Sequence, residues 1–384
     1  MNSKIFGLLL LFSLFFFDFE LLKIYCKKHF PILLFFAWVV IGLLYTEDTS
    51  AGLKKVGKLA ILPASVLVFG LIKLEPKTVL KILKFYVLCV LIAALYSHGI
   101  KLYDFFANNE PSFRNFFNLN YSYLALAKTL DLHPTYYSFF VLIAISIILD
   151  FLRQKMKIIY FFCGIILISY LSFFIVHLSS RMAIIILYLL LITHLLWQAY
   201  THKKIIRGIF FLVLLHGFLV LTLLNVGATK YRFQHLLGFT YYTGYTVNDG
   251  NHKKKLWSAA FNANKQIVFG NGIGDVQPSL NDQYKLAVLT KPLAENYNSH
   301  NQYIEYYVGL GGIGVILFLG LLLYYGLTFV RQKNRLGVYF IGIMSLLCIT
   351  ECIWNRHHGL VFLSIMLGLL WTISPSFPTL DRES

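Results

Sequence analysis

Apolar runs close to twenty residues long recur along most of this chain. An α-helix needs about 20 such residues to cross the hydrocarbon core of a bilayer. The spanning segments must be helical, because hydrocarbon offers the backbone no hydrogen-bond partners. Charged residues make up only 13% of the 384 residues, whereas soluble domains carry roughly 25%. The sequence therefore predicts an all-α polytopic membrane protein.

The hydrophobicity pattern predicts about eleven transmembrane spans, and a twelfth is possible near the N-terminus. The spans are expected at 5–19, 30–45, 57–73, 79–97, 134–152, 158–176, 182–200, 208–226, 303–330, 336–354 and 359–373. The first apolar run has no small-residue cleavage site, so we expect it to be retained as a span. We expect residues 1–384 to form a single integral membrane domain.

Basic residues in the short loops predict how the chain is oriented. Cytoplasmic loops carry an excess of Lys and Arg. The strongly basic short loops are 153–157, 203–207 and 331–335. The connections expected on the outer side are then 98–133, 177–181, 227–302 and 355–358. Lys54, Lys55 and Lys58 conflict with this assignment, because it also places them on the outer side.

Residues 227–302 form the only long extramembrane segment, and long loops are often functional. We expect this segment to be one large loop on the outer side. It contains Phe269-Gly-Asn-Gly-Ile-Gly-Asp275. No βαβ pattern surrounds these glycines, so a tight turn is expected here instead of a nucleotide-binding loop.

The net charge of +17 would suggest a nucleic-acid partner in a soluble protein. Here most of the positive charge lies in short loops, where it sets topology, so no nucleic-acid partner is expected. The cysteines show no metal-ligand spacing with histidine. They are Cys26, Cys89, Cys163, Cys348 and Cys352. We expect no metal and no cofactor.

His300 and Asn301 lie where the polar loop becomes an apolar helix. One interpretation is structural, with Asn298 or Ser299 capping the helix and His300 merely interfacial. The other is that the His300 imidazole accepts a proton from an incoming hydroxyl, because its pKa is normally near neutrality. Glycines at 309 and 312 would give the following span a smooth strip for packing. A carboxylate inside that span, Glu305, is expected to face the interior, with Arg356 as a possible partner.

Arg181 lies between two apolar spans on the expected outer side, against the charge rule. It could snorkel to lipid headgroups, or its planar guanidinium could bind a phosphate. Lys230 and Arg232 follow the eighth predicted span. They could form a basic–aromatic interfacial anchor or a second phosphate contact. Two or three cations around one site would favour a diphosphate.

Glu351 and Arg356 stand near the end of a predicted span, and their pairing could orient the site or be purely structural. His357 and His358 are adjacent and therefore point in different directions, which is poor geometry for one metal ion. His133, before Pro134 at the entry to a span, could line an outer cavity.

Taken in order, these motifs resemble the O-antigen ligase and polymerase family of bacterial inner-membrane glycan transferases. The likeness runs from about His133 to Gly359. Its most specific part is His300-Asn-x-Tyr-x-Glu, followed by Gly309 and Gly312, directly after a large outer loop. The Ser180-Arg181 turn, the Gly-x-Gly-Asp turn and the segment Glu351 to Gly359 support it.

The resemblance implies a glycosyltransferase C-like fold in the bacterial inner membrane, with an active site that faces the periplasm. It also implies transfer of a glycan from an undecaprenyl-diphosphate carrier to an acceptor hydroxyl on lipid A-core or another glycan. We then expect Arg181, Arg232 and Lys230 to hold the diphosphate and stabilise the leaving group. His300 would deprotonate the acceptor, and attack from the opposite face would invert the anomeric centre without a metal.

Further substrate contacts are predicted for side chains beside these groups. They are Asn301, Tyr303, Glu351, Arg356 and His133. Whether the protein is a ligase or a polymerase is left open, because the two differ in the acceptor. A glycan-lipid transporter would predict inverted repeats and midplane charges, and the sequence shows no repeat. A non-enzymatic assembly partner would tolerate loss of His300 and Arg181.

Overall fold

The computed structural model describes residues 2–72, 74–153, 157–201, 217, 226–236 and 249–374. Every regular element in these ranges is helical. The chain folds into two compact units, and each is described by itself below. The first unit is Met1–Leu80 with Asn251–Ser384, and the second is Lys81–Gly250. The prediction of a single domain stays a prediction.

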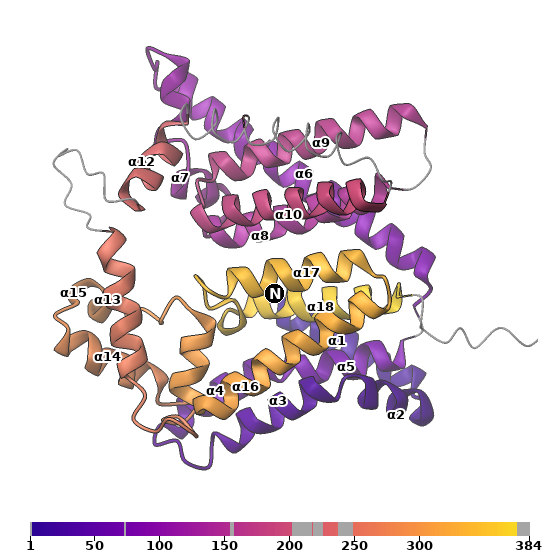
Figure 1. Ribbon diagram of the computed structural model, residues 1–384, viewed down its shortest axis with the longest axis vertical. Coiled ribbons are helices and arrows are strands. Elements are labelled where there is room, and N and C mark those ends of the chain that lie inside the picture. The colour runs from indigo at the N-terminus through magenta and orange to yellow at the C-terminus, as the bar shows by residue number, and fades with distance from the viewer. Residues whose placement is uncertain are drawn as a thin grey trace, which may run out of the picture. The chain divides into compact units, whose positions relative to one another are not determined.

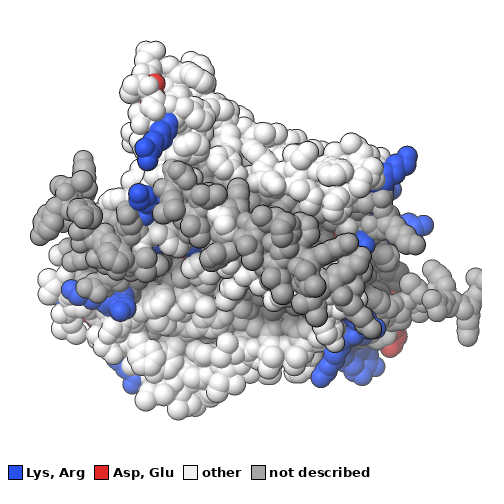
Figure 2. All heavy atoms as spheres, turned by 45° about the horizontal axis from the view of Figure 1, so that its top comes forward, with Lys and Arg blue, Asp and Glu red and all other residues white. Residues whose placement is uncertain are grey.

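Five described helices are long and apolar enough to cross a membrane. They are α6 (Pro76–Ala107), α8 (Pro134–Phe151), α9 (Ile158–His177), α10 (Arg181–Thr201) and α16 (Gln302–Arg331). The count becomes six if the bent pair Leu22–Lys28 and Phe30–Ile41 is one span. Figure 2 shows large stretches of uncharged surface, with Lys and Arg in separate groups. These features confirm an all-α polytopic membrane protein.

The remaining predicted spans are shorter helices or lie outside the described residues. The predicted span 57–73 corresponds to α4 (Thr49–Leu59) and α5 (Ile61–Leu71), which adjoin at Ala60. Spans 336–354 and 359–373 correspond to α17 (Arg335–Leu347) and α18 (His357–Thr372). Span 5–19 begins as α1 (Asn2–Ser13) with the 3₁₀ turn η1 (Leu14–Phe16). Span 208–226 falls almost wholly outside the described residues.

In the second unit, α8 is the central helix, because 72% of its apolar window is buried. It packs against α9 and α10 (Figure 1). Its start follows from the sequence: Pro134 occupies the first helical turn, and His133 Nδ1 accepts a hydrogen bond from Thr135 N at 3.4 Å. Proline suits this position because the first turn needs no backbone N–H donor.

The segment between α6 and α8 forms a small aromatic core of its own. It contains η2 (Phe113–Phe117), α7 (Leu124–Ala127) and η3 (Lys128–Leu130). Phe105, Phe116 and Tyr121 are buried against one another. The Glu110 carboxylate accepts hydrogen bonds from Tyr121 OH and Asn115 Nδ2, both at 2.8 Å. This part of the chain is therefore a folded element instead of a simple connector.

In the first unit, α16 packs against α3 (Phe30–Ile41) and α17. The helix α5 packs against α18 and α2 (Phe19–Lys28). Helices α2 and α3 meet at a 76° bend. His29 lies at this bend, and its Nδ1 is 2.7 Å from Tyr325 OH of α16. The bend is thus fixed to the helix that carries the predicted base at its start.

Residues 249–301 fold into helices that share a core with α16. These are α13 (Asp249–Asn262), α14 (Val276–Leu286) and α15 (Thr290–Ala294) (Figure 1). Leu256, Ala260, Leu280 and Tyr284 are buried together with Val308 of α16. The first turns of α16 are therefore held by the loop segment that precedes them.

Helix α16 is broken at Gly311, where φ is 66° and ψ is −167°. Segment 267–272 supplies backbone partners at the break. Asn271 N donates to Val308 O at 2.8 Å, and Gly312 N donates to Ile267 O at 2.7 Å. The sequence did not indicate this break, although the close packing expected at the glycines is present at Gly309, where a Cβ would collide with Val276. The Gly-x-Gly motif does form a turn, and this turn packs directly against the glycines of α16.

Replacing Gly311 by Ala is expected to destabilise the protein. A Cβ at this position would collide with Val268 O, and a strained backbone conformation costs about 1–3 kcal/mol. The purified protein should therefore have a lower Tm in detergent. Gly320→Ala is the matched control in the same helix, because a Cβ there meets nothing within 4 Å. A Gly311→Ala variant as stable as Gly320→Ala would contradict the break.

Candidate functional site

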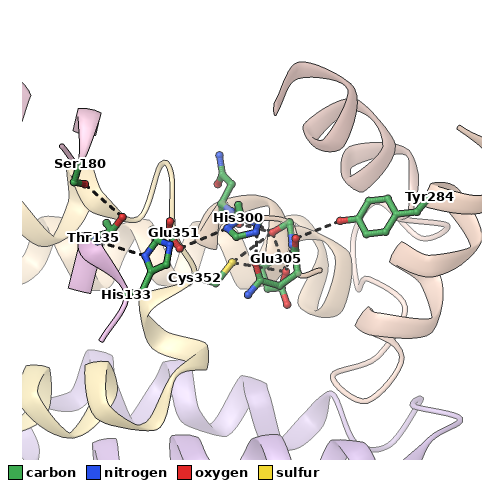
Figure 3. Close-up of polar contacts among 11 residues, drawn as sticks. His133, Thr135, Ser180, Tyr284, His300, Glu305, Glu351 and Cys352 are labelled. Carbon is green, nitrogen blue, oxygen red and sulfur yellow. Dashed lines mark hydrogen bonds and ion pairs between the residues drawn. The ribbon is translucent and has the colours of Figure 1, made fainter. Parts of the chain in front are cut away.

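The predicted base, His300, contacts a carboxylate from a distant part of the chain. His300 Nδ1 lies 3.5 Å from Glu351 Oε2 (Figure 3). The His300 side chain is 30% exposed, and that of Glu351 is 12% exposed. A carboxylate at one ring nitrogen orients the imidazole and leaves the other nitrogen to act as a base. The structure thus gives Glu351 a place beside His300.

The turn that carries His300 is held by its neighbours. His300 has a positive φ of 50°, and its backbone N–H donates to Asn298 Oδ1 at 3.0 Å. Asn301 caps α16, because its Oδ1 accepts from Tyr303 N at 3.0 Å and from Ile304 N at 3.1 Å. The helix cap expected at Asn298 or Ser299 is therefore Asn301. Its predicted substrate contact stays a prediction.

Glu305 is buried in the first turn of α16, and its hydrogen-bond partners are neutral groups. Its Oε2 accepts from Ser299 N at 3.1 Å and from Ser299 Oγ at 2.8 Å. Its Oε1 accepts from Asn355 Nδ2 at 2.8 Å. The expected partner Arg356 is exposed instead. Pairing of Glu305 with Arg356 was therefore wrong, because the neighbouring Asn355 side chain takes the inward position.

The connection between α17 and α18 is fastened to the start of α16. Gln302 Oε1 accepts from Trp354 N at 2.9 Å, and Gln302 N donates to Cys348 O at 2.8 Å. These bonds bring Glu351 and Asn355 onto the turn around His300. Arg356, in contrast, follows the η4 turn (Ile353–Asn355) and is exposed. Its predicted pairing with Glu351 is replaced in this structure by the contact of Glu351 with His300.

The Cys352 thiol lies in the same cluster, 3.6 Å from Ser299 Oγ. Burial raises the pKa of this thiol well above its usual value, and the nearby Glu305 carboxylate acts in the same direction. A thiol with a raised pKa is a poor nucleophile. Cys352 is therefore a packing residue, as the sequence predicted.

Tyr303 points away from this cluster toward α17. Its hydroxyl donates to Ser345 O at 2.9 Å, and its ring lies 5.6 Å from that of Phe318. These contacts give Tyr303 a role in joining α16 to α17. Its predicted substrate contact is not tested by them.

Lys55 of α4 is a cation that sequence reasoning did not assign to the site. Burial lowers the pKa of its ammonium group, and the Glu305 carboxylate acts in the opposite direction. Helix α4 also contacts the η4 turn. Lys55 is therefore an electrostatic neighbour of the turn that carries His300. The sequence did contain a signal, because Lys54, Lys55 and Lys58 conflicted with the charge rule.

In the second unit, Arg181 and Arg232 come together from segments that are separated by 51 positions. Arg181 is the first residue of α10, and Arg232 lies in α12 (Gly227–Leu236). Arg181 Nη1 donates to Arg232 O at 3.4 Å. The Arg181 side chain therefore contacts the backbone of Arg232, a second residue predicted to bind the diphosphate.

Hydroxyl groups hold α12 against the end of α9. Thr229 Oγ1 donates to Val176 O at 2.9 Å, and Ser179 Oγ lies 2.9 Å from Thr229 Oγ1. Lys230, on the same helix, is exposed.

His133 is connected to the Arg181 turn through Thr135, whose Oγ1 accepts from Ser180 Oγ at 3.4 Å. The capping role of His133 is visible here, and its predicted place in a cavity stays a prediction.

One donor of the Arg232 side chain is not satisfied by any described residue. Its Nε is buried and has no hydrogen-bond partner within the described ranges. Leaving a buried donor unpaired costs about 1–3 kcal/mol, and more for a charged group. An acceptor from a ligand would remove this cost. The described residues contain no cluster of three or more His, Cys, Asp or Glu side chains suited to a metal ion.

Comparison with known protein families places this geometry in context. Residues 165–319 match the family model described as O-Antigen ligase. The predicted family is confirmed. The match covers less than half of the 384-residue chain. It includes Arg181, Arg232 and His300. A search of curated proteins found no significant match.

At a coarse level, this match supports a role in glycan assembly of the O-antigen ligase or polymerase type. The matched family implies a glycosyl-transfer enzyme. Of the predicted site residues, Arg181 and Arg232 are brought together in the second unit. In the first unit, His300 and Glu351 are brought together, with Asn301 next to them.

Asn355→Ala is expected to destabilise the first unit. The change leaves Glu305 Oε1 without its donor, which should cost about 1–3 kcal/mol because the carboxylate is buried. The measurement is the Tm of the protein in detergent. Asn281→Ala is a suitable control, because it removes amide–amide contacts to Gln277 and Asn296 and touches no buried charge, and surface changes are usually within about 0.5 kcal/mol. Equal Tm values for the two variants would show that Asn355 does not support Glu305.

Proposed function

We propose that this protein transfers a glycan from undecaprenyl-diphosphate to an acceptor hydroxyl at the periplasmic face of the bacterial inner membrane. The observation that carries the proposal is the meeting of Arg181 with Arg232 inside the region that matches the O-antigen ligase family. The Arg181 guanidinium group reaches the backbone of Arg232, so two arginines from adjoining segments can supply positive charge to one diphosphate. We also propose that residues 227–302 lie in the periplasm and that the chain acts as a single domain.

The donor half of the proposed reaction uses the cations of the second unit. Arg181 and Arg232, with the exposed Lys230 two positions before Arg232 on α12, bind the diphosphate oxygens. The unpartnered Nε–H of Arg232 is available to such an oxygen. As the glycosidic bond breaks, negative charge develops on the leaving diphosphate. Fixed positive donors stabilise that charge more than the ground state, which lowers the barrier.

The acceptor half uses the pair in the first unit. His300 Nδ1 is directed to Glu351, so that Nε2 is the nitrogen that can receive a proton. The acceptor hydroxyl oxygen attacks the anomeric carbon, and its proton passes to Nε2. The bond from the anomeric carbon to the diphosphate oxygen breaks, and its electron pair leaves with undecaprenyl diphosphate. Attack opposite the leaving group inverts the anomeric centre, and this scheme assigns no step to a metal.

Ligase and polymerase remain two forms of this proposal, because they differ in the acceptor and share the donor chemistry. The acceptor is lipid A-core for a ligase and another glycan chain for a polymerase. A glycan-lipid transporter is the less favoured alternative. It does not need a histidine with an orienting carboxylate, whereas hydroxyl deprotonation does.

His300→Ala and Arg181→Ala should each lower glycan transfer by about 100-fold or more, as expected for loss of a transition-state donor or base. The assay uses purified protein, a lipid-diphosphate glycan and an acceptor glycan. Arg331→Ala, at the far end of α16, is the control and should keep wild-type activity. Full transfer by both site variants would disprove the proposal. Lipid flux without transfer in reconstituted vesicles would support the transporter instead.

Glu351→Gln should lower kcat on the order of 10- to 100-fold, within the roughly 10²–10⁴ that a general base contributes. Glutamine keeps the size of the side chain but can present an N–H to His300 Nδ1, which favours the wrong tautomer. The KM for the lipid-linked donor should change little, because Glu351 does not contact the diphosphate in this scheme. A normal kcat in Glu351→Gln would show that the carboxylate has no part in activating His300.

A further inference from the structure

An aromatic ring lies directly against the guanidinium group of Arg232. Arg232 Cζ is 3.5 Å from the centroid of the Tyr123 ring. This is the separation of direct contact between a guanidinium group and a ring face, and the ring quadrupole attracts the cation. Hydrogen-bond donors of a guanidinium group lie in its plane, so a ring against its face leaves them available. Tyr123 comes from the segment between α6 and α8, which sequence analysis did not connect to the site.

The backbone of Tyr123 adopts a conformation that side chain–bearing residues rarely adopt, with φ 53° and ψ −118°. Such a conformation costs on the order of 1–3 kcal/mol and persists only where the surroundings hold it. Here Tyr123 N donates to His177 O at 3.2 Å, and Ala127 N donates to Tyr123 O at 3.1 Å. His177 is the last residue of α9 and stands four positions before Arg181. The strained residue is thus tied to the same turn as the other predicted phosphate ligand.

Two buried histidines hold this segment in place. His177 Nε2 lies 3.1 Å from Phe116 O, which can only accept, so this nitrogen carries the proton. His177 Nδ1 must then accept from His98 Nε2, 3.0 Å away. His98 Nδ1 in turn accepts from Tyr170 OH at 3.1 Å. Each group in this series donates to the next, from Tyr170 through His98 and His177 to Phe116 O. These hydrogen bonds join α6 and α9 to the segment that carries Tyr123.

We propose that Tyr123 is a positioning residue that holds the Arg232 guanidinium group for the diphosphate of the donor. This inference rests on the proposed function and adds a residue to it. Arg232 is fixed from three parts of the second unit. Its helix is tied to α9 through Thr229, its carbonyl accepts from Arg181, and its guanidinium group lies on Tyr123. The ring sets the plane of the cation without occupying its donors.

The test replaces Tyr123 by Phe, by phenylalanines with one to three ring fluorines, and by Leu. Fluorine withdraws electron density from the ring face and weakens its attraction for a cation, while the shape of the side chain is nearly kept. All these residues carry a Cβ, so the backbone strain is the same in each. Transfer kinetics are measured for each variant with purified full-length protein and a lipid-diphosphate glycan.

Tyr123→Phe should stay within about twofold of wild type, because the ring is kept. The value of kcat/KM should fall stepwise with fluorination and drop by about 3- to 30-fold in Tyr123→Leu. In an Arg232→Ala background, Tyr123→Leu should cause no further loss, because the group that it positions is gone. Tyr103→Leu, in the same unit but 74% exposed, is the matched control and should resemble wild type.

Three results would overturn the role of Tyr123. They are an unchanged kcat/KM in Tyr123→Leu, a kcat/KM that does not respond to fluorination, and an equal additional loss from Tyr123→Leu when Arg232 is already Ala. Failure of the proposed function is a separate outcome. It would be seen as no transfer by the wild-type protein or as full transfer by Arg232→Ala alone. The fluorinated series keeps the test decisive even if Tyr123→Leu does not fold.

Discussion

The backbone break at Gly311 is the feature on which the arrangement of the first unit depends. An interrupted helix leaves N–H and C=O groups that need partners, and segment 267–272 supplies them. The part of α16 beyond the break, residues 312–331, still has the length of about 20 residues that a span requires. The part before the break packs on α13 and α14, carries Glu305 and follows directly after His300 and Asn301. The break thus separates a helix of spanning length from the short helix that begins beside the proposed base.

The proposed reaction requires polar groups that are fixed near a membrane surface, and each unit holds such groups by its own contacts. In the first unit, Ser299 and Asn355 donate hydrogen bonds to the buried Glu305 carboxylate, and Lys55 is its cationic neighbour. In the second unit, hydroxyl groups and a ring hold Arg232, and its Nε–H has no hydrogen-bond partner in the described part of the chain. Donors that are fixed but unpaired are what an anion site requires.

Local signals in the sequence were sufficient for much of the fold. Hydropathy located α6, α8, α9, α10 and α16 to within a few residues at most ends, with a larger error at the end of α6. His133-Pro134 marked the start of α8 correctly. Sequence proximity was a poor guide to side-chain pairing where the true partner lies far away in the sequence. The spacing of Glu351 and Arg356 suggested a pair, but the fold turns Glu351 to His300 and leaves Arg356 exposed. The contact of Tyr123 with Arg232 spans 109 positions and has no local pattern.

The central claim is that the cations around Arg181 and the imidazole of His300 serve one reaction on the periplasmic side. Its most direct test is labelling of Lys230→Cys and His300→Cys in intact cells with a membrane-impermeant maleimide. Cys26, Cys89 and Cys163 are replaced by Ala beforehand, and Cys348 and Cys352 are buried. The account predicts that both new thiols react from outside, whereas a thiol in Lys333→Cys reacts only after permeabilisation. Reaction of positions 230 and 300 from opposite sides of the membrane would contradict it.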